Sequence, residues 1–238
     1  MKTFVVTGSN AGLGKEIYKA LTLAGKEVIG IDSAPESEHV QLSMDITFEP
    51  NWSAQSLAEI FFMEIDCVIN CAGVNMISSL DDLEMKDYQK VMDTNMKSVL
   101  LSTQFFLDTL RSSHGTIVNV VSNASHMPMT DSFAYNASKG ALEIATRQMA
   151  RELTKRYDIT VFGISPNKLA GTEMSEYIDN TFPPMRGMTY DEGRKYQLNG
   201  LLTGKETEPK QIAELLAFLL QSKERHEYLS GCVLELGL

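Results

Sequence analysis

Four polar side chains in this sequence have types and spacings suited to acid–base chemistry. Tyr135 and Lys139 are four residues apart, so on a helix both side chains project from one face. The pKa of free tyrosine is near 10, and an ammonium group about 4 Å away would stabilise the phenolate by roughly 4 kcal/mol at an effective dielectric constant of about 20. Ser122 follows an apolar run thirteen residues before Tyr135, and Asn95 lies in an earlier helical pattern. A lone Tyr-x-x-x-Lys pair is usually structural, so the whole set is what predicts proton transfer.

A glycine-rich turn lies between the first apolar run and the first helical pattern. Glycines at such a junction allow a tight bend, and the free N–H groups at the helix start can then hold a pyrophosphate. The spacing differs from G-x-G-x-x-G, and a flexible turn without a ligand is the alternative, but its position at the first strand–helix junction favours a dinucleotide site. The predicted cofactor-binding residues of this turn are Gly8, Ser9, Asn10, Gly12, Leu13 and Gly14.

Asp32 ends the second apolar run, about twenty residues after the glycines, where a carboxylate can accept hydrogen bonds from the adenosine ribose. A 2′-phosphate beside it would be repelled by a few kcal/mol at an effective dielectric constant of about 20. The following stretch, 33–38, holds no Lys or Arg to compensate. The sequence therefore favours NAD over NADP, with a polar loop residue as the alternative interpretation of Asp32.

Short apolar runs alternate with helical patterns along the chain. The runs are apolar throughout, which is typical of strands buried on both faces of a parallel sheet. Helices are predicted over about 83–111, about 134–156, and after Thr207 as N-cap with Pro209 in the first turn. This order predicts right-handed βαβ units in a three-layer, doubly wound α/β domain of the Rossmann type. The expected strands are 4–6, 28–31, 68–69, 117–121, 161–164 and 232–234.

The composition excludes several classes of protein. The chain has 238 residues and a formal net charge of −10, with no Lys/Arg run longer than two, so neither nucleic acid nor a membrane surface is an expected partner. The apolar segments are too short for a membrane span or a signal peptide, which predicts a cytoplasmic protein of one domain, 1–238. Cys67 and Cys71 would lie about 13 Å apart on one strand, so we expect core thiols and no metal site.

Several motifs in register resemble the classical short-chain dehydrogenase/reductase family over essentially the whole chain. Thr7-Gly8-x-x-x-Gly12-x-Gly14 is similar to the family's cofactor turn, and Asn70-Cys71-Ala72-Gly73 to its Asn-Asn-Ala-Gly motif. Asp45-Ile46 fits the family's aspartate segment that contacts adenine. The positions that match the family's catalytic residues in order and spacing are Asn95, Ser122, Tyr135 and Lys139.

The resemblance implies an NAD-dependent oxidoreductase that interconverts a secondary alcohol and a ketone. Hydride transfer at carbon requires proton transfer at oxygen, and the resemblance assigns that proton to Tyr135. Ser122 would hydrogen-bond the reacting oxygen, Lys139 would also hold the nicotinamide ribose, and Asn95 would support a water-linked proton path. A buried amide that pins the backbone is the open alternative for Asn95. Further expected cofactor contacts are Asn70, Ala72, Gly73, Tyr135 and Lys139.

Three segments depart from the family pattern. After the sixth strand, Pro166-Asn167 stands where the family has Pro-Gly, and the following threonine comes one position late, so either Leu169 or Thr172 is expected to reach the nicotinamide. Cys71 replaces an asparagine, and the C-terminus lacks the usual Asp-Gly-Gly.

Substrate specificity is expected in residues 173–204, where the family carries a lid. The segment is rich in apolar and aromatic residues that could line a pocket, and its cations Arg186, Arg194 and Lys195 could meet an anionic group. The alternative for each of these residues is that it simply packs the segment onto the domain. Met174 and His126 are the candidate substrate contacts.

Relatives form dimers or tetramers through their two long helices, so we expect a homodimer or homotetramer. A catalytically silent NAD-binding sensor or scaffold is the alternative function. Sugar-nucleotide epimerases share the Tyr/Lys pair but generally need a longer C-terminal region.

Overall fold

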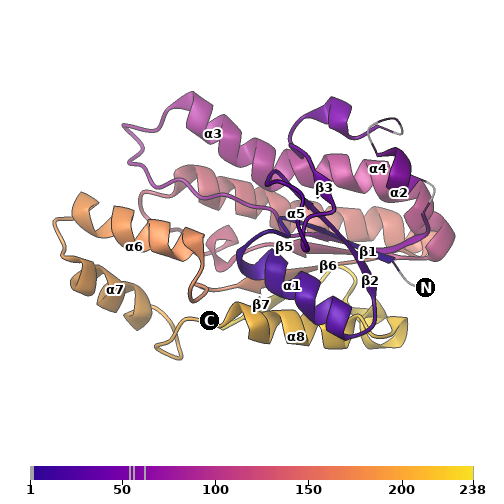
Figure 1. The fold of residues 1–238 in the computed structure, drawn as a ribbon. Helices are drawn as coiled ribbons and strands as arrows, with labels where there is room; N and C mark the ends of the chain where they lie inside the picture. Colours follow the sequence, from indigo (N-terminus) through magenta and orange to yellow (C-terminus); the bar gives the residue numbers. More distant parts are fainter. Residues whose placement is uncertain (1–2, 54, 56, 62, 238) are drawn as a thin grey trace.

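The computed structural model describes residues 3–53, 55, 57–61 and 63–237, which form a three-layer α/β/α sandwich (Figure 1). The central sheet has seven strands in the order β3-β2-β1-β4-β5-β6-β7, and every neighbouring pair is parallel. This confirms the predicted doubly wound parallel sheet. The strands are β1 (Thr3–Thr7), β2 (Glu27–Asp32), β3 (Leu42–Ser43), β4 (Ile65–Asn70), β5 (Thr116–Val120), β6 (Thr160–Pro166) and β7 (Val233–Leu236).

The central strands are apolar throughout because helices cover both faces of the sheet. Successive strand residues point to opposite faces, so Phe4 and Val6 of β1 join one core cluster while Val5 joins another. All five residues of β1 are buried. The runs of apolar residues therefore reflect burial on two faces, as expected from the sequence.

Two groups of helices supply these two layers, as Figure 1 shows. Helices α1 and α8 lie together on one face, where Ile17 and Leu216 pack into the cluster that contains Val6. Helices α4 and α5 cover the other face, where Phe106 and Leu153 join the cluster of Val5. The α-helices are α1 (Gly12–Leu23), α2 (Ala58–Phe61), α3 (Met85–Met92), α4 (Ser98–Ser113), α5 (Phe133–Tyr157), α6 (Glu173–Met185), α7 (Tyr190–Asn199) and α8 (Pro209–Leu219).

Three predicted details of the elements are wrong. The expected helix over 83–111 is interrupted by a π-helical turn, η2 (Asp93–Lys97), between α3 and α4. The two-residue strand β3 was not predicted because it is too short to carry a pattern. The N-cap of α8 is Glu208 rather than Thr207, which instead forms a β-bridge with Leu169. The remaining short helices are η1 (Glu49–Asn51), η3 (Asn123–Ser125), η4 (Lys223–Arg225) and η5 (Glu227–Leu229).

The strand order fixes where a ligand can bind. After β1 the chain builds β2 and β3 on one side and then crosses to β4 on the other, so the crossovers diverge between β1 and β4. Ligands of open α/β sheets bind at the carboxyl ends of the strands at such a switch point. Helices α6 and α7 lie beside the layers at the end where α1 begins (Figure 1).

Candidate functional site

The glycine turn brings three backbone segments unusually close together. Gly8 has φ +72°, and a Cβ on it would lie 2.7 Å from Ala72 Cα after β4. A Cβ on Gly14 would lie 2.0 Å from the Gly8 carbonyl oxygen. Neither position can accept a side chain, because real Cβ atoms do not approach backbone this closely. The two glycines thus allow α1 to start directly against β1 and the β4 loop.

The start of α1 has the features of a dinucleotide phosphate site. Its N-cap, Ala11, makes no side-chain cap, and its first turn holds no acidic residue, so no side chain of the helix competes with an anion there. The fully buried Ser9 hydroxyl has no hydrogen-bond partner among the described residues. The predicted Gly12, Leu13 and Asn10 lie on the same turn. These residues therefore fit a dinucleotide's pyrophosphate.

Asp32 ends β2 beside this turn. Its carboxylate accepts hydrogen bonds from the N–H groups of Asn10 (3.1 Å) and Ala34 (2.9 Å). The carboxylate is thereby held next to the glycine turn, where the ribose of a bound dinucleotide would lie. Both interpretations of Asp32, a structural acceptor and a ribose acceptor, are compatible with this position.

The β4 motif is held by polar side chains inside the sheet. Thr7 Oγ1 accepts hydrogen bonds from the N–H groups of Cys71 (3.1 Å) and Ala72 (3.2 Å). The buried Asn70 amide donates to Asn119 (2.9 Å) and accepts from Ser102 (2.6 Å). The side chain of Asn70 is therefore committed to the interior, whereas Ala72 lies against the glycine turn.

The predicted adenine segment lies at the edge of the β2–β3 side. Asp45 is exposed, and its carboxylate accepts hydrogen bonds from the N–H (2.8 Å) and hydroxyl (2.7 Å) of Thr47. Ile46 is 8% exposed and packs in the core. The exposed carboxylate is thus the part of this segment that a ligand could reach.

The structure brings Ser122, Tyr135 and Lys139 together. Tyr135 and Lys139 lie on one face of α5, where the Lys139 ammonium is 5.8 Å from the centre of the tyrosine ring. Ser122 follows β5, caps η3, and hydrogen-bonds the Tyr135 hydroxyl. The Lys139 ammonium donates to the Val120 carbonyl (2.8 Å) and lies near Gly73, where a Cβ would be 3.6 Å from Nζ. The group therefore borders the β4 loop and, through it, the glycine turn.

The chain by itself does not lower the pKa of Tyr135. Burial raises the pKa of this phenol, and the hydrogen bond with Ser122 offsets only part of the effect. Burial also lowers the pKa of Lys139 to about 8. Lys139 is not among the groups that shift the pKa of Tyr135 in the chain alone, and its ammonium is turned toward the Val120 carbonyl.

Asn95 is completely buried in the π-helical turn, and its side chain pins the backbone. Its Oδ1 accepts from the Val74 N–H (2.8 Å), and its Nδ2 donates to the Val74 carbonyl (2.9 Å) and to Ser138 Oγ (2.9 Å). This geometry favours the structural interpretation of the side chain. The role of Ser138, one residue before Lys139, was missed because a serine on a helix carries no distinctive signal.

Cys71 differs from the expected core thiol. Cys67 is buried as expected, but Cys71 is half-buried, and its sulfur lies close enough to Lys139 to interact electrostatically. Burial of the thiol raises the pKa of Cys71 to about 12, so the group is neutral at physiological pH. The residue that replaces the family's asparagine is thus an inert neighbour of Lys139.

Thr172, rather than Leu169, lies beside the cofactor turn. A Cβ on Gly12 would be 3.6 Å from Thr172 Cγ2, whereas Leu169 packs against a core cluster. Thr172 also caps α6 by accepting a hydrogen bond from Ser175 N–H (3.2 Å). The unusual Asn167 donates from its amide to the carbonyl of Gly237, so the atypical C-terminus is tied to this segment.

The two candidate substrate residues lie in different places. Met174 is half-buried in the first turn of α6. His126 lies between Glu143 (3.8 Å) and Glu235 (3.7 Å), and Glu143 follows Tyr135 by eight residues, or about 12 Å along the helix. His126 is therefore directed toward α5 and β7 well away from the tyrosine hydroxyl.

Helix α6 contacts the loop after β4 through a residue that the sequence did not single out for a role. The hydroxyl of Tyr177 accepts a hydrogen bond from the Ile77 N–H (3.1 Å). A tyrosine within an aromatic-rich segment gave no signal for this contact. Segment 173–204, which the sequence predicts to be a lid, thus contacts the same loop that carries Gly73.

Comparison with known proteins decides the family. Residues 2–182 match the family described as short chain dehydrogenase. This chain belongs to that family. An NAD-dependent glycerol dehydrogenase of Listeria innocua is 32% identical to this short-chain dehydrogenase, over 69% of each chain. A 2-dehydro-3-deoxy-D-gluconate 5-dehydrogenase of Formosa agariphila is 30% identical, over 72% of this chain and 71% of the relative.

A solved structure of actinorhodin polyketide ketoreductase with NADPH has the same fold, with a TM-score of 0.87 and 21% identity over 99% of this chain and 95% of that one. This short-chain dehydrogenase is accordingly an oxidoreductase, and its family uses nicotinamide cofactors. Among the residues that the structure describes, no helix is long and apolar enough to cross a membrane.

Proposed function

We propose that this short-chain dehydrogenase is a cytoplasmic, NAD-dependent enzyme that interconverts a secondary alcohol and a ketone, with Tyr135 as general acid and base. The observation that carries the proposal is the cluster of Ser122 with the buried Tyr135 and Lys139 beside the β4 loop, which itself packs on the glycine turn. None of the three cysteines, all of which the structure describes, forms a disulfide, which suits a reducing compartment.

A bound nicotinamide supplies or accepts the hydride, and the oxidised ring carries a positive charge. The protein's own residues position the substrate and move its proton. The Ser122 hydroxyl, already hydrogen-bonded to Tyr135, orients the reacting oxygen. Tyr135 donates its proton to a ketone or takes the proton of an alcohol at that oxygen.

Lys139 stands where it can favour the phenolate and hold a ribose hydroxyl. Its buried ammonium has one hydrogen bond to a carbonyl and lies near Gly73, so further N–H donors remain for a ligand. Burial raises the pKa of Tyr135 in the chain alone, and the positive charge of an oxidised nicotinamide nearby would lower it.

Asp32 supports NAD as the cofactor. Its carboxylate lies beside the glycine turn and would repel a 2′-phosphate. The glycerol dehydrogenase relative is described as NAD-dependent, whereas the ketoreductase structure holds NADPH. The carboxylate in this chain favours the first of these two cofactors.

The proposal is tested by Tyr135→Phe, which removes one hydroxyl and keeps the ring. We expect turnover to fall by about 100-fold to 10,000-fold, since proton transfer loses its acid and base, while the NADH dissociation constant stays within about threefold. The measurements are NADH consumption across a ketone panel and NADH fluorescence titration. Tyr228→Phe, at a side chain that is 84% exposed, is the matched control.

Unchanged turnover of Tyr135→Phe would contradict the mechanism. Failure of the unaltered protein on every alcohol and ketone, with both cofactors, would favour the silent sensor or scaffold instead.

A further inference from the structure

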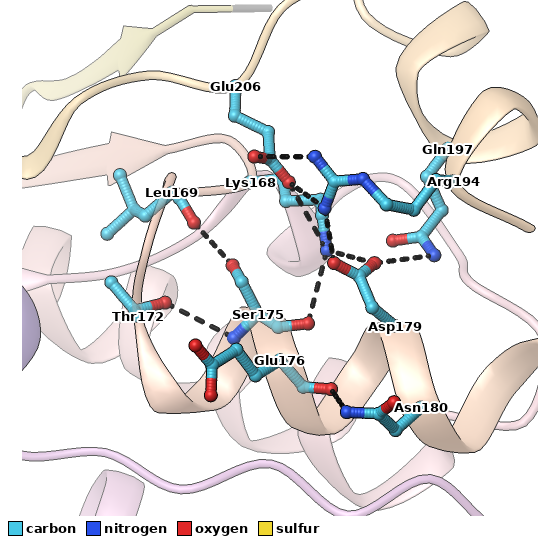
Figure 2. Close-up of polar contacts among 10 residues, drawn as sticks. All are labelled: Lys168, Leu169, Thr172, Ser175, Glu176, Asp179, Asn180, Arg194, Gln197 and Glu206. Atoms are coloured by element: carbon cyan, nitrogen blue, oxygen red, sulfur yellow. Dashed lines mark hydrogen bonds and ion pairs between the residues drawn. The ribbon is translucent and has the colours of Figure 1, made fainter. Parts of the chain in front are cut away.

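Four charged side chains join the lid to the segment after β6 (Figure 2). Asp179 of α6 accepts from Lys168 (2.8 Å) and is also paired with Arg194 of α7. Arg194 in turn donates two hydrogen bonds to Glu206 (3.1 and 3.2 Å), which lies 3.6 Å from Lys168. Two cations and two carboxylates therefore neutralise one another.

Three of the four side chains are largely removed from water, whereas that of Arg194 is 31% exposed. The side chains of Asp179, Lys168 and Glu206 are 3%, 10% and 11% exposed. If Arg194 turned to a substrate anion, the buried Asp179 would lose one of its two cationic partners. Lys168 would remain beside Asp179, but breaking an ion pair to a carboxylate that is only 3% exposed is unfavourable, so the cluster opposes that rearrangement. Neither Lys168 nor Arg194 is therefore available for an anionic substrate.

The other two cations of the lid, Arg186 and Lys195, do not supply a partner for an anionic substrate either. Arg186 pairs with Asp131 (3.4 Å) on the loop before α5 and stacks on the Phe182 ring. Lys195 is exposed and follows Arg194 on α7, so its side chain leaves the helix about 100° away from the face that meets Asp179. Over residues 173–204 there are three cationic and five acidic side chains, a net charge of −2.

The segment that follows the catalytic serine adds no free cation either. Ser125 donates to the Glu143 carboxylate (2.5 Å), and this hydrogen bond together with Arg147 holds the pKa of Glu143 below its usual value. His126 lies between that carboxylate and Glu235. In these two segments, Arg186, Arg194 and His126 thus all lie beside carboxylates.

We infer that this enzyme acts on uncharged alcohols and ketones and discriminates against substrates that carry a carboxylate or phosphate. The inference rests on the proposed oxidoreductase function and specifies its substrate class. An anion brought into the site would be desolvated without a cationic partner. The inferred substrate class therefore differs from that of the relative described as a 2-dehydro-3-deoxy-D-gluconate 5-dehydrogenase and resembles that of the relative described as a glycerol dehydrogenase. Of the two roles that the sequence left open for Arg186 and Arg194, the ion pairs favour the structural one.

The first experiment compares uncharged substrates with related substrates that carry a carboxylate. The pairs are glucitol with gluconate, methyl levulinate with levulinate, and cyclopentanol with 3-hydroxycyclopentanecarboxylate. For every pair that is turned over, kcat/KM of the uncharged member should exceed that of the anion by about tenfold or more. Measurement at two ionic strengths shows whether long-range repulsion contributes.

The second experiment frees the buried cations. Asp179→Asn keeps the shape of the side chain but leaves Lys168 and Arg194 facing only Glu206, a net charge of +1. We expect the anion-to-neutral ratio of kcat/KM to rise by about fivefold or more. Glu176→Gln is the matched control, because Glu176 is an exposed acid on the same helix and loses the same charge without touching the cluster. Circular dichroism and NADH binding verify that both variants fold.

The outcomes are distinguishable. Preference of the unaltered enzyme for the anionic members would overturn the inference while leaving the oxidoreductase function intact. An equal ratio in Asp179→Asn and Glu176→Gln would also overturn it, since net charge alone would then explain selectivity. If Asp179→Asn does not fold, Glu206→Gln frees the same cations and takes its place. Activity on no member of any pair would overturn the proposed function itself.

Discussion

Replacing Asn95 by alanine tests whether the Asn95 side chain holds the backbone in place or supports a water-linked proton path. The side chain is fully buried and makes three hydrogen bonds, two to the backbone of Val74 and one to Ser138. At about 1 kcal/mol of net stability each, their loss predicts that Asn95→Ala lowers the free energy of unfolding by about 3 kcal/mol. Total stabilities of about 5–15 kcal/mol are usual, so the variant should still fold.

The same change should weaken cofactor binding. Val74 follows Gly73, and a Cβ on Gly73 would lie 3.4 Å from Asn95 Oδ1, so the amide supports the loop that packs on the glycine turn. We therefore expect a higher NADH dissociation constant together with reduced kcat. A pure proton path would reduce kcat alone.

The assay is urea unfolding followed by NADH fluorescence titration and steady-state kinetics. Asn180→Ala is the matched control, because Asn180 is exposed on α6 and its loss should change stability by no more than about 0.5 kcal/mol. A loss of stability below about 1 kcal/mol in Asn95→Ala, with unchanged NADH binding and reduced kcat, would refute the structural reasoning.

Three further outcomes are expected. Asp32→Asn keeps the shape of the side chain and one of its two acceptor oxygens but removes the charge, so kcat/KM with NADP relative to NAD should rise by about tenfold or more. An unaltered enzyme that already prefers NADPH would contradict the cofactor assignment. Iodoacetamide at pH 8 should modify the exposed Cys232 and spare Cys71, because the pKa of Cys71, about 12, leaves only about one thiol in 10,000 ionised. Peptide mass spectrometry can measure the modification of each cysteine. Leu100 and Ile144 are 45% and 68% exposed on the two long helices, where we expect subunits to meet. Ile144→Arg should therefore lower the mass of a dimer or tetramer measured by light scattering. A monomeric unaltered protein would contradict the expected oligomer.

Much of the fold follows from local patterns. The apolar runs predicted six of the seven strands, since strands buried on both faces need apolar residues at every position, and helix α5 was predicted to within one residue at each end. Strand β3 and the π-helical turn were missed, because one has two residues and the other keeps a helical periodicity.

The sequence by itself determined which residue types meet at the candidate site, because Ser122, Tyr135 and Lys139 are placed by a strand end and by one helix face. Only the tertiary structure decided which of the surrounding charged side chains pair with one another. The partners of Asp179 lie 11 and 15 residues away on different elements, so no local pattern shows that Lys168 and Arg194 form ion pairs with Asp179. Likewise, the pKa values of Tyr135 and Lys139 depend on burial, which arises only when the helices close over the sheet.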